Sequence, residues 1–172
     1  KGIALRYNLP CVPVHHIEGH IYSPFLEDPT LSFPAVVLVV SGGHTTLFLV
    51  RSFSSYEILG NTRDDAAGEA FDKAAKLLGL GYPGGVAIDR LSMRDRKDAI
   101  RFPRALLHEE GYEFSFSGVK TAVRNHLRHH YREGIDDDSV RTVCSSLQEA
   151  IVDVLVTKTM RAAREHKVDS VL

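Results

Sequence analysis

One stretch constrains the fold more than any other: two short apolar runs separated by a Gly-Gly turn. The first run covers residues 35–40 and is rich in valine, and the second begins at Leu47. Short, bounded runs rich in β-branched residues are typical of buried strands. Two such runs around Gly-Gly predict adjacent antiparallel strands joined by a tight turn. The chain is therefore expected to contain a buried sheet.

The turn itself, Ser41-Gly42-Gly43-His44, has two interpretations. Glycines adopt φ > 0 without strain and can turn several N–H groups the same way, which makes a cradle for an anion. The hydroxyls of Ser41, Thr45 and Thr46 could donate to the same anion. The same residues also suit an ordinary hairpin turn, and both interpretations stay open at this point.

Composition limits the classes of protein to consider. The 172 residues are 44% hydrophobic and 25% charged, enough for one domain or two small lobes. A net charge of −1 gives no global basic field for nucleic acid. Cys11 and Cys144 form no paired motif, and the given sequence shows no signal-peptide pattern and no run of transmembrane length. We expect a cytoplasmic protein with no membrane partner.

A metal site is one interpretation of two histidines near the N-terminus. His16 and His20 lie four apart in a predicted helix near residues 16–27, so both imidazoles share one face. A zinc protease would need Glu directly after the first histidine, and Ile17 stands there. Two exposed helical histidines are the alternative. A metal would also need a third ligand from elsewhere in the protein.

The remaining elements follow from periodicity and turn residues. A turn-rich segment at 28–34 predicts a boundary between residues 1–33 and 34–172. We expect short strands at 9–15, 56–60 and from 168 onward. A helix over 64–79, capped by Thr62 or Asp64, should carry the ion pairs Glu69–Lys73 and Asp72–Lys76.

Three more helices are expected further along the chain. One follows the turn Tyr82-Pro-Gly-Gly85, with Asp89 in its first turn and 92–97 continuing or ending it. A second is capped by Ser117 and exposes basic residues. The third is long, begins near Ser139 and buries a stripe that includes Met160. The basic residues at 124–132 are a weak indication of RNA contact.

Five motifs, in order, resemble those of one family over essentially the whole chain. They are Lys1-Gly with Tyr7–Pro10 and His16-x-x-Gly-His-Ile21; Ser41-Gly-Gly-His44; Asp64-Asp-Ala-Ala-Gly-Glu-Ala-Phe-Asp-Lys73; Tyr82-Pro-Gly-Gly85; and Phe114-Ser-Phe-Ser-Gly-Val-Lys-Thr121. The chain resembles the TsaD family of tRNA N6-adenosine threonylcarbamoyltransferases, formerly named O-sialoglycoprotein endopeptidases. The sequence of residues 64–85 is similar to that of the bacterial branch of the family. Val86 departs from the proline that often follows Pro-Gly-Gly in the family.

The resemblance implies a fold and a set of site residues. The fold would be α/β, an actin-like ATPase (ASKHA, ribonuclease H-like) fold that is incomplete. Residues 1–33 would be the end of an N-terminal lobe, and 34–172 most of a C-terminal lobe. His16 and His20 would hold one divalent metal ion, iron or zinc. The adenylate substrate, with ATP and Mg as a further possibility, would be held by Val39, Val40, Ser41, Gly42, Gly43, Asp72, Gly85 and Asp89.

The resemblance also implies a reaction. The threonylcarbamoyl group of threonylcarbamoyl-AMP would pass to N6 of adenine-37 in tRNAs reading ANN codons, with Asp72 and Asp89 binding ribose hydroxyls and no covalent protein nucleophile. A metal would polarise the transferred group. Expected partners are tRNA, a bacterial TsaB paralogue and the TsaE ATPase. The family's third metal ligand and one nucleotide-binding asparagine lie beyond residue 172, so we expect a fragment that is inactive alone.

Three other functions compete with this one. A metallopeptidase is suggested by the old family name, but the missing Glu after His16 speaks against it. A non-catalytic paralogue that serves as a binding subunit would be expected to lack the His16–His20 pair. A sugar kinase or other ATPase of the same fold would need an acidic catalytic base near a sugar site, and no candidate is apparent.

Overall fold

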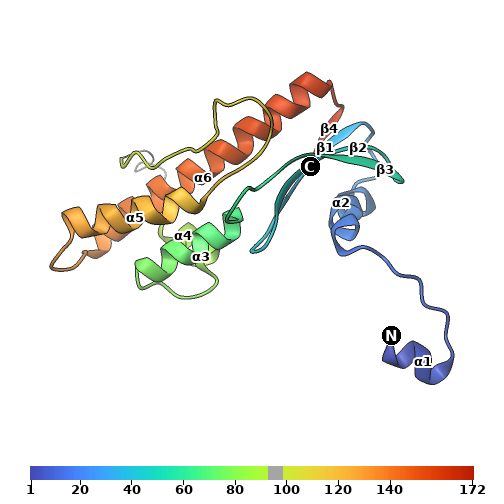
Figure 1. Cartoon of the computed structure of the whole chain (residues 1–172), viewed down its shortest axis with the longest axis horizontal. Helices are drawn as coiled ribbons and strands as arrows, with labels where there is room; N and C mark the ends of the chain where they lie inside the picture. Colours follow the sequence, from blue (N-terminus) through green and yellow to red (C-terminus); the bar gives the residue numbers. More distant parts are fainter. Residues whose placement is uncertain (93–98) are drawn as a thin grey trace. The chain divides into compact units, whose positions relative to one another are not determined.

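A four-stranded sheet is the central element of the computed structural model, which describes residues 1–92 and 99–172. Its strands lie in the order β3-β2-β1-β4 (Figure 1). β1 (Ala35–Val40), β2 (Thr45–Ser52) and β3 (Ser55–Asn61) are successive antiparallel strands. β4 (Ser170–Val171) pairs in parallel with β1, with Ala35 opposite Ser170. The predicted hairpin, the strand at 56–60 and the strand after 168 are confirmed.

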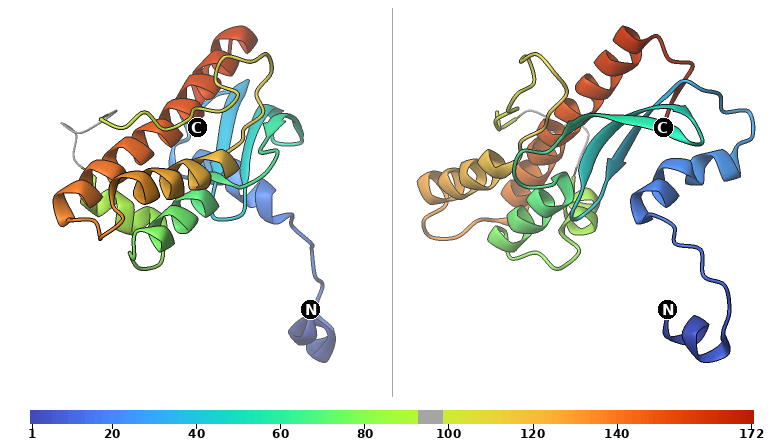
Figure 2. Two further views of the ribbon diagram at one scale, coloured as in Figure 1. Left: turned by 60° about the vertical axis from the view of Figure 1, so that its left-hand side comes forward. Right: turned by 45° about the vertical axis from the view of Figure 1, so that its right-hand side comes forward.

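Within the described residues, four helices return the chain from β3 to β4 (Figures 1 and 2). They are α3 (Ala67–Leu77), α4 (Gly84–Leu91), α5 (Ser117–His130) and α6 (Asp137–His166). α6 packs against β1 and β4 on one face of the sheet. β1, β2 and β3 form an antiparallel meander, and the helices then lead to β4, which is parallel to β1. The fold is therefore a mixed α/β fold. The predicted fold class is confirmed. The part of residues 92–97 that follows Ser92 lies outside the described residues.

The core lies between this sheet face and the helices. Every second residue of a strand points to the same face, so Val36, Leu47 and Leu49 meet the helices together. α3 contributes mostly alanines, including buried Ala67, Ala70 and Ala74, which lets its axis approach its neighbours closely. Phe114 and Phe116, just before α5, are the largest apolar side chains that are fully buried.

One prediction about α6 is wrong. Its buried stripe includes Leu147, Ile151 and Val154 as expected, but Met160 is 38% exposed. Lys158 occupies the buried position instead and is 1% exposed, with its ammonium donating to the Gly111 carbonyl at 3.3 Å. The 3.6-residue period carries the stripe through residue 158, so a residue two positions later turns outward.

The first 31 residues form a separate unit, distinct from residues 32–172. It contains α1 (Gly2–Tyr7) and α2 (His16–Glu27). The strand expected at 9–15 is wrong, since that segment has no regular structure. Pro10 and Pro13 each remove a backbone donor there, which weakens any strand pairing. Among the described residues, no helix of either unit is long and apolar enough to cross a membrane.

Candidate functional site

The turn between β1 and β2 is exposed and closed by its own serine. The Ser41 N–H donates to the His44 carbonyl at 2.8 Å. The N–H groups of Gly43 and His44 donate to the Ser41 hydroxyl at 3.3 and 3.1 Å. Among the described glycines, those with positive φ are Gly79, Gly111 and Gly134, so Gly42 and Gly43 do not use left-handed backbone. An anion at this turn would compete with Ser41 Oγ for the two N–H groups.

The first turn of α3 is fastened to this hairpin. The buried Thr45 hydroxyl accepts the N–H of Ala67 at 2.9 Å, and the N–H of Gly68 donates to the Ser41 carbonyl at 3.3 Å. A Cβ added at Gly68 would lie 2.5 Å from that carbonyl oxygen, so only glycine fits without a shift. The Thr45 oxygen therefore holds the start of the helix.

Asp72, in the middle of α3, fastens the next motif to the same helix. Its Oδ1 accepts the N–H of Gly84, the first residue of α4, at 2.7 Å. A Cβ on Gly84 would meet Phe71 O at 2.7 Å and Asp72 Cα at 2.6 Å, so α4 begins in close backbone contact with α3. The expected Asp72–Lys76 ion pair is replaced by this bond to Gly84.

An open groove of about 540 Å³ runs along the polar side of α3 and the turn after it. Its volume lies in the range of small-molecule sites. Acidic, basic and aromatic side chains all line it, so it can meet a phosphate, a hydroxyl and a ring. The lining residues are Glu69, Asp72, Lys73, Lys76, Gly79, Leu80, Gly81 and Tyr82.

The other two predicted ligand residues lie on α4. Gly85 is partly buried, and no atom would lie within 4 Å of an added Cβ apart from its neighbours, so its backbone is open to a ligand. Asp89 is exposed and lies in the second turn, which corrects the expected first-turn position. The Gln148 amide of α6 donates to its Oδ1 at 3.0 Å. Sequence reasoning did not single out Gln148, because its partner lies on another helix.

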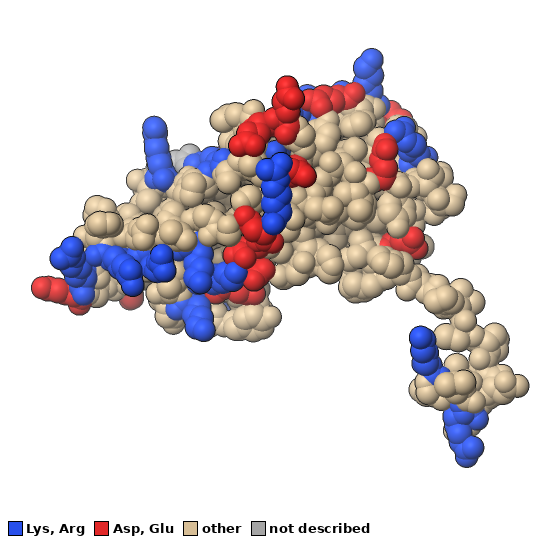
Figure 3. Space-filling model, viewed as in Figure 1, with Lys and Arg blue, Asp and Glu red and all other residues tan. Residues whose placement is uncertain are grey.

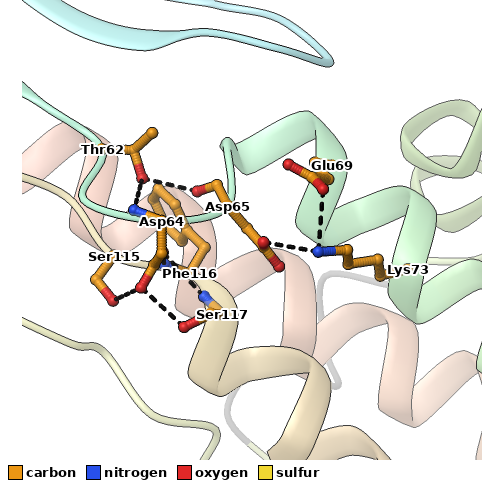
Figure 4. A network of polar contacts seen from close by, with 8 residues as sticks. All are labelled: Thr62, Asp64, Asp65, Glu69, Lys73, Ser115, Phe116 and Ser117. Carbon is orange, nitrogen blue, oxygen red and sulfur yellow. Dashed lines mark hydrogen bonds and ion pairs between the residues drawn. The ribbon is translucent and has the colours of Figure 1, made fainter.

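Asp64 has a structural position that the motif pattern did not reveal (Figure 4). Its carboxylate accepts the N–H groups of Phe116 and Ser117 at 2.8 and 3.2 Å, and the hydroxyls of Ser115 and Ser117 at 2.6 and 2.8 Å. Asp64 thus caps α5, not α3. Partial burial raises its pKa, but these four hydrogen bonds outweigh burial and lower the pKa to about 2.

The predicted caps of α3 and α5 are both wrong for this reason. α3 begins after Ala66, and its first N–H is capped by Thr45 of β2. Ser117 is the first residue of α5 and makes no cap of its own, since Phe116 is the residue before the helix.

Lys73 joins the two acidic residues beside it on and before α3. Its ammonium lies 2.6 Å from Asp65 Oδ1 and 3.0 Å from Glu69 Oε1 (Figure 4). The hydrogen bonds to Asp65 and Glu69 raise the pKa of Lys73. The predicted Glu69–Lys73 pair is confirmed, and it places an ammonium at the wall of the groove.

His16 and His20 lie together on α2, within the first unit. Their Nε2 atoms are 3.2 Å apart, and the rings meet edge to face with centroids 4.5 Å apart. Two nitrogens bound to one tetrahedral zinc at ~2.0–2.1 Å would lie about 3.3 Å apart, so the pair fits that geometry. No group of three or more His, Cys, Asp or Glu suited to a metal occurs within the described parts of the chain. The pair would therefore be a partial donor set.

Comparison with known proteins identifies the family. The family model described as TsaD, tRNA N6-adenosine threonylcarbamoyltransferase, matches residues 1–172. Proteins named tRNA N6-adenosine threonylcarbamoyltransferase are similar over the whole chain: the Geobacter metallireducens protein is 54% identical, that of Syntrophus aciditrophicus 50% and that of Listeria innocua 49%. The chain spans about half the length of these curated relatives, 49–50% of each. With this match over every residue, the chain belongs to the TsaD family.

Proposed function

We propose that the protein carries part of the site that transfers a threonylcarbamoyl group from threonylcarbamoyl-AMP to N6 of adenine-37 in tRNAs reading ANN codons. One observation carries the proposal. The motifs at 41–44, 64–73 and 82–85 are separate in sequence, yet hydrogen bonds and glycine contacts join all three through α3. A single rigid helix therefore positions the turn, an acidic side chain and the start of α4 for one ligand.

Each predicted ligand residue has a role in this proposal. The turn Ser41–Gly43, with Val39 and Val40 leading into it at the end of β1, would bind the adenylate phosphate, which would displace Ser41 Oγ from the N–H groups of Gly43 and His44. Asp72 and Asp89 accept hydrogen bonds from ribose hydroxyls. Gly85 leaves the backbone of α4 open to the nucleotide. Lys73 and Tyr82, both in the groove wall, add a positive charge and an aromatic ring.

The chemistry is acyl transfer without an enzyme nucleophile. The N6 amine of adenine attacks the carbonyl carbon of the threonylcarbamoyl group, the bond from that carbon to the phosphate oxygen breaks, and AMP leaves with the electron pair. The amine loses its proton to the leaving phosphate or to water. The protein's contribution is to orient the two substrates, which lowers the entropic barrier.

His16 and His20 would hold one divalent metal, iron or zinc, and further ligands would complete the site. When bound, such an ion supplies Lewis acidity toward the transferred carbonyl group. The imidazole pair, set one helical turn apart on α2, fixes two donor nitrogens in advance.

The proposal includes the expected partners and compartment. These are tRNA, a TsaB-type paralogue and a TsaE-type ATPase, all in the cytoplasm. The alternatives of a metallopeptidase and a non-catalytic paralogue are not favoured, because the similar proteins carry a transferase name. Co-purification with recombinant TsaB and TsaE tests the protein partners.

Adenylate binding tests the proposal most directly. Titration of AMP into the zinc-loaded protein by calorimetry, with the full-length Geobacter metallireducens relative in parallel, should give heat that depends on the metal. The variant His16→Ala/His20→Ala should lose zinc, measured by atomic absorption, and should weaken AMP binding. The exposed pair His129→Ala/His130→Ala serves as the matched control and should change neither.

Two results separate the outcomes. Binding by the relative but not by this chain would mean that the nucleotide site needs residues outside 1–172. AMP binding by neither protein would overturn the assignment of the groove and return the turn at 41–44 to a plain hairpin.

A further inference from the structure

α5 carries a stripe of cations on its exposed side, about 100° round the helix from its buried face. Lys120, Arg124 and Arg128 follow one another at intervals of four residues, and Arg132 continues the series just past the helix. All four are exposed, whereas Val119 and Val123 are buried. A step of four residues turns the helix by only about 40° beyond a full turn, so the three helical cations stay on one side.

No acidic residue opposes this stripe within α5. Residues 117–132 contain neither Asp nor Glu. In the parts of the chain that the structure describes, no ion pair joins any of the four cations to a carboxylate. Figure 3 shows a row of Lys and Arg side chains over the part of the molecule that α5 occupies in Figure 1. The net charge of −1 for the chain makes this local excess of positive charge distinctive.

A shallow hollow of about 490 Å³ lies at the far end of the stripe. It is lined by Leu127, Arg128, Tyr131 and Arg132. A half-buried aromatic ring that lines the same hollow as two arginines is a surface on which an unstacked base can lie while its phosphates meet the cations. The Tyr131 ring is itself supported by His126, with centroids 5.7 Å apart.

The stripe is held in place by the same elements as the groove. The Asp64 carboxylate fixes the first turn of α5, and α5 packs along α3, which carries Asp72 (Figures 2 and 4). A strand of RNA lying on the stripe would therefore be held at a fixed position relative to the groove.

We propose that Lys120, Arg124, Arg128 and Arg132 bind the phosphate backbone of a single-stranded or looped segment of RNA, with one base against Tyr131. The three helical cations cover about 12 Å of helix axis. A single strand that keeps helical stacking carries a phosphate about every 3.4 Å of axis, so the stripe spans roughly three phosphates of such a strand. The identification of that RNA as the tRNA substrate rests on the proposed function.

Fluorescence anisotropy with a labelled, unmodified tRNA transcript that reads ANN codons tests the proposal. The variant Arg124→Gln/Arg128→Gln should bind roughly 10- to 40-fold more weakly at 0.1 M salt, and its salt slope should fall by about 1.5. The variant Arg164→Gln/Lys167→Gln removes two exposed cations at the end of α6 and should change affinity less than about twofold. Urea midpoints of both variants show whether the fold is intact.

A second pair of variants tests the base contact. Tyr131→Leu should weaken tRNA binding by roughly 5- to 100-fold, the range of one base–aromatic stack, while Tyr131→Phe should retain it. A fully duplex RNA of equal length should not show this difference.

Three results would overturn the inference. The first is equal tRNA affinity of the α5 and α6 double variants. The second is binding of anionic phosphatidylserine vesicles through Arg124 and Arg128 without binding of tRNA. If the unmodified protein binds no tRNA, the inference falls. AMP calorimetry then decides separately on the proposed function, because Arg124 and Arg128 do not line the groove.

Discussion

Replacing Asp64 tests whether this motif aspartate is an architectural group. Asp64→Ala removes an acceptor shared by two backbone N–H groups and two hydroxyls, so the N-terminus of α5 loses its only cap among the described contacts. Asp64→Asn keeps one oxygen for the N–H groups of Phe116 and Ser117 but removes the charge. We expect the free energy of unfolding to fall by about 2 kcal/mol for Ala and about 1 kcal/mol for Asn.

The size of the effect follows from the pKa. A fall from the ordinary 3.8 to about 2 would correspond to at most about 2.5 kcal/mol. Asp64 is exposed, so solvent screening reduces this to about 1–1.5 kcal/mol. Removal of a hydrogen-bonded carboxylate from a helix N-terminus typically lowers the free energy of unfolding by an amount in the same range.

The pH dependence has a definite sign. The folded-state pKa is below the unfolded value, so the carboxylate contributes fully above about pH 4 and its contribution is lost as pH falls toward 2. Urea unfolding followed by circular dichroism at pH 7, 5, 4 and 3 should therefore show the difference between Asp64 and Asp64→Asn shrinking at low pH.

Asp65→Asn is the matched control, because it makes the same change one residue along. It removes the pair with Lys73, whose side chain is 33% exposed, and should cost less than about 1 kcal/mol. Equal unfolding midpoints for Asp64→Ala and the unmodified protein, or a difference that does not vary between pH 7 and 3, would refute the capping argument.

Three further predictions test the other contacts. Gly68→Ala places a Cβ 2.5 Å from a backbone oxygen and should destabilise the protein by about 1–3 kcal/mol in urea, whereas Gly118→Ala, which meets open space, should be neutral or stabilising. Asp72→Ala should cost about 1–2 kcal/mol by leaving a buried N–H unpaired, with Asp72→Asn costing less in the same assay. Burial raises the pKa of the Cys144 thiol to about 11, so a thiol reagent at pH 8 should titrate one thiol, the exposed Cys11, and the second only in denaturant.

Much of the fold could be predicted because its signals are local. Valine-rich runs around Gly-Gly specify a hairpin, and the 3.6-residue period of α6 specifies its buried face. The glycine turn before α4 also marks a helix start. These patterns depend on residues a few positions apart, which a single sequence displays directly.

The errors concern partners that are distant in sequence. Asp64 was a candidate cap for the helix that follows it, yet its partners begin with Ser115, 51 residues away. Thr45 caps α3 across 22 residues. Asp72 had a plausible partner in Lys76 one turn away, but a backbone N–H from α4 takes its carboxylate. Nothing in the local pattern ranks a tertiary partner above a neighbour.

Most residues of the candidate site could be predicted from the sequence, but the contacts that join them could not. The motifs indicated the turn, Asp72, Gly85 and Asp89, while the joining contacts through Gly68 and Gln148 required three-dimensional structure. The φ argument for the Gly-Gly turn was wrong at Gly42 and Gly43, and the close approach that needs glycine occurs at Gly68 instead.

The parallel pairing of β1 with β4 has a consequence for synthesis of the chain. β1 gains its hairpin partner β2 almost at once, but its other edge waits for Ser170 and Val171. At ~5–20 residues per second, the ribosome needs roughly 7 to 27 s to supply that strand. During this time an apolar strand with an unpaired edge is exposed, which is a template for association with other chains. We therefore expect the nascent chain to depend on chaperones until β4 emerges.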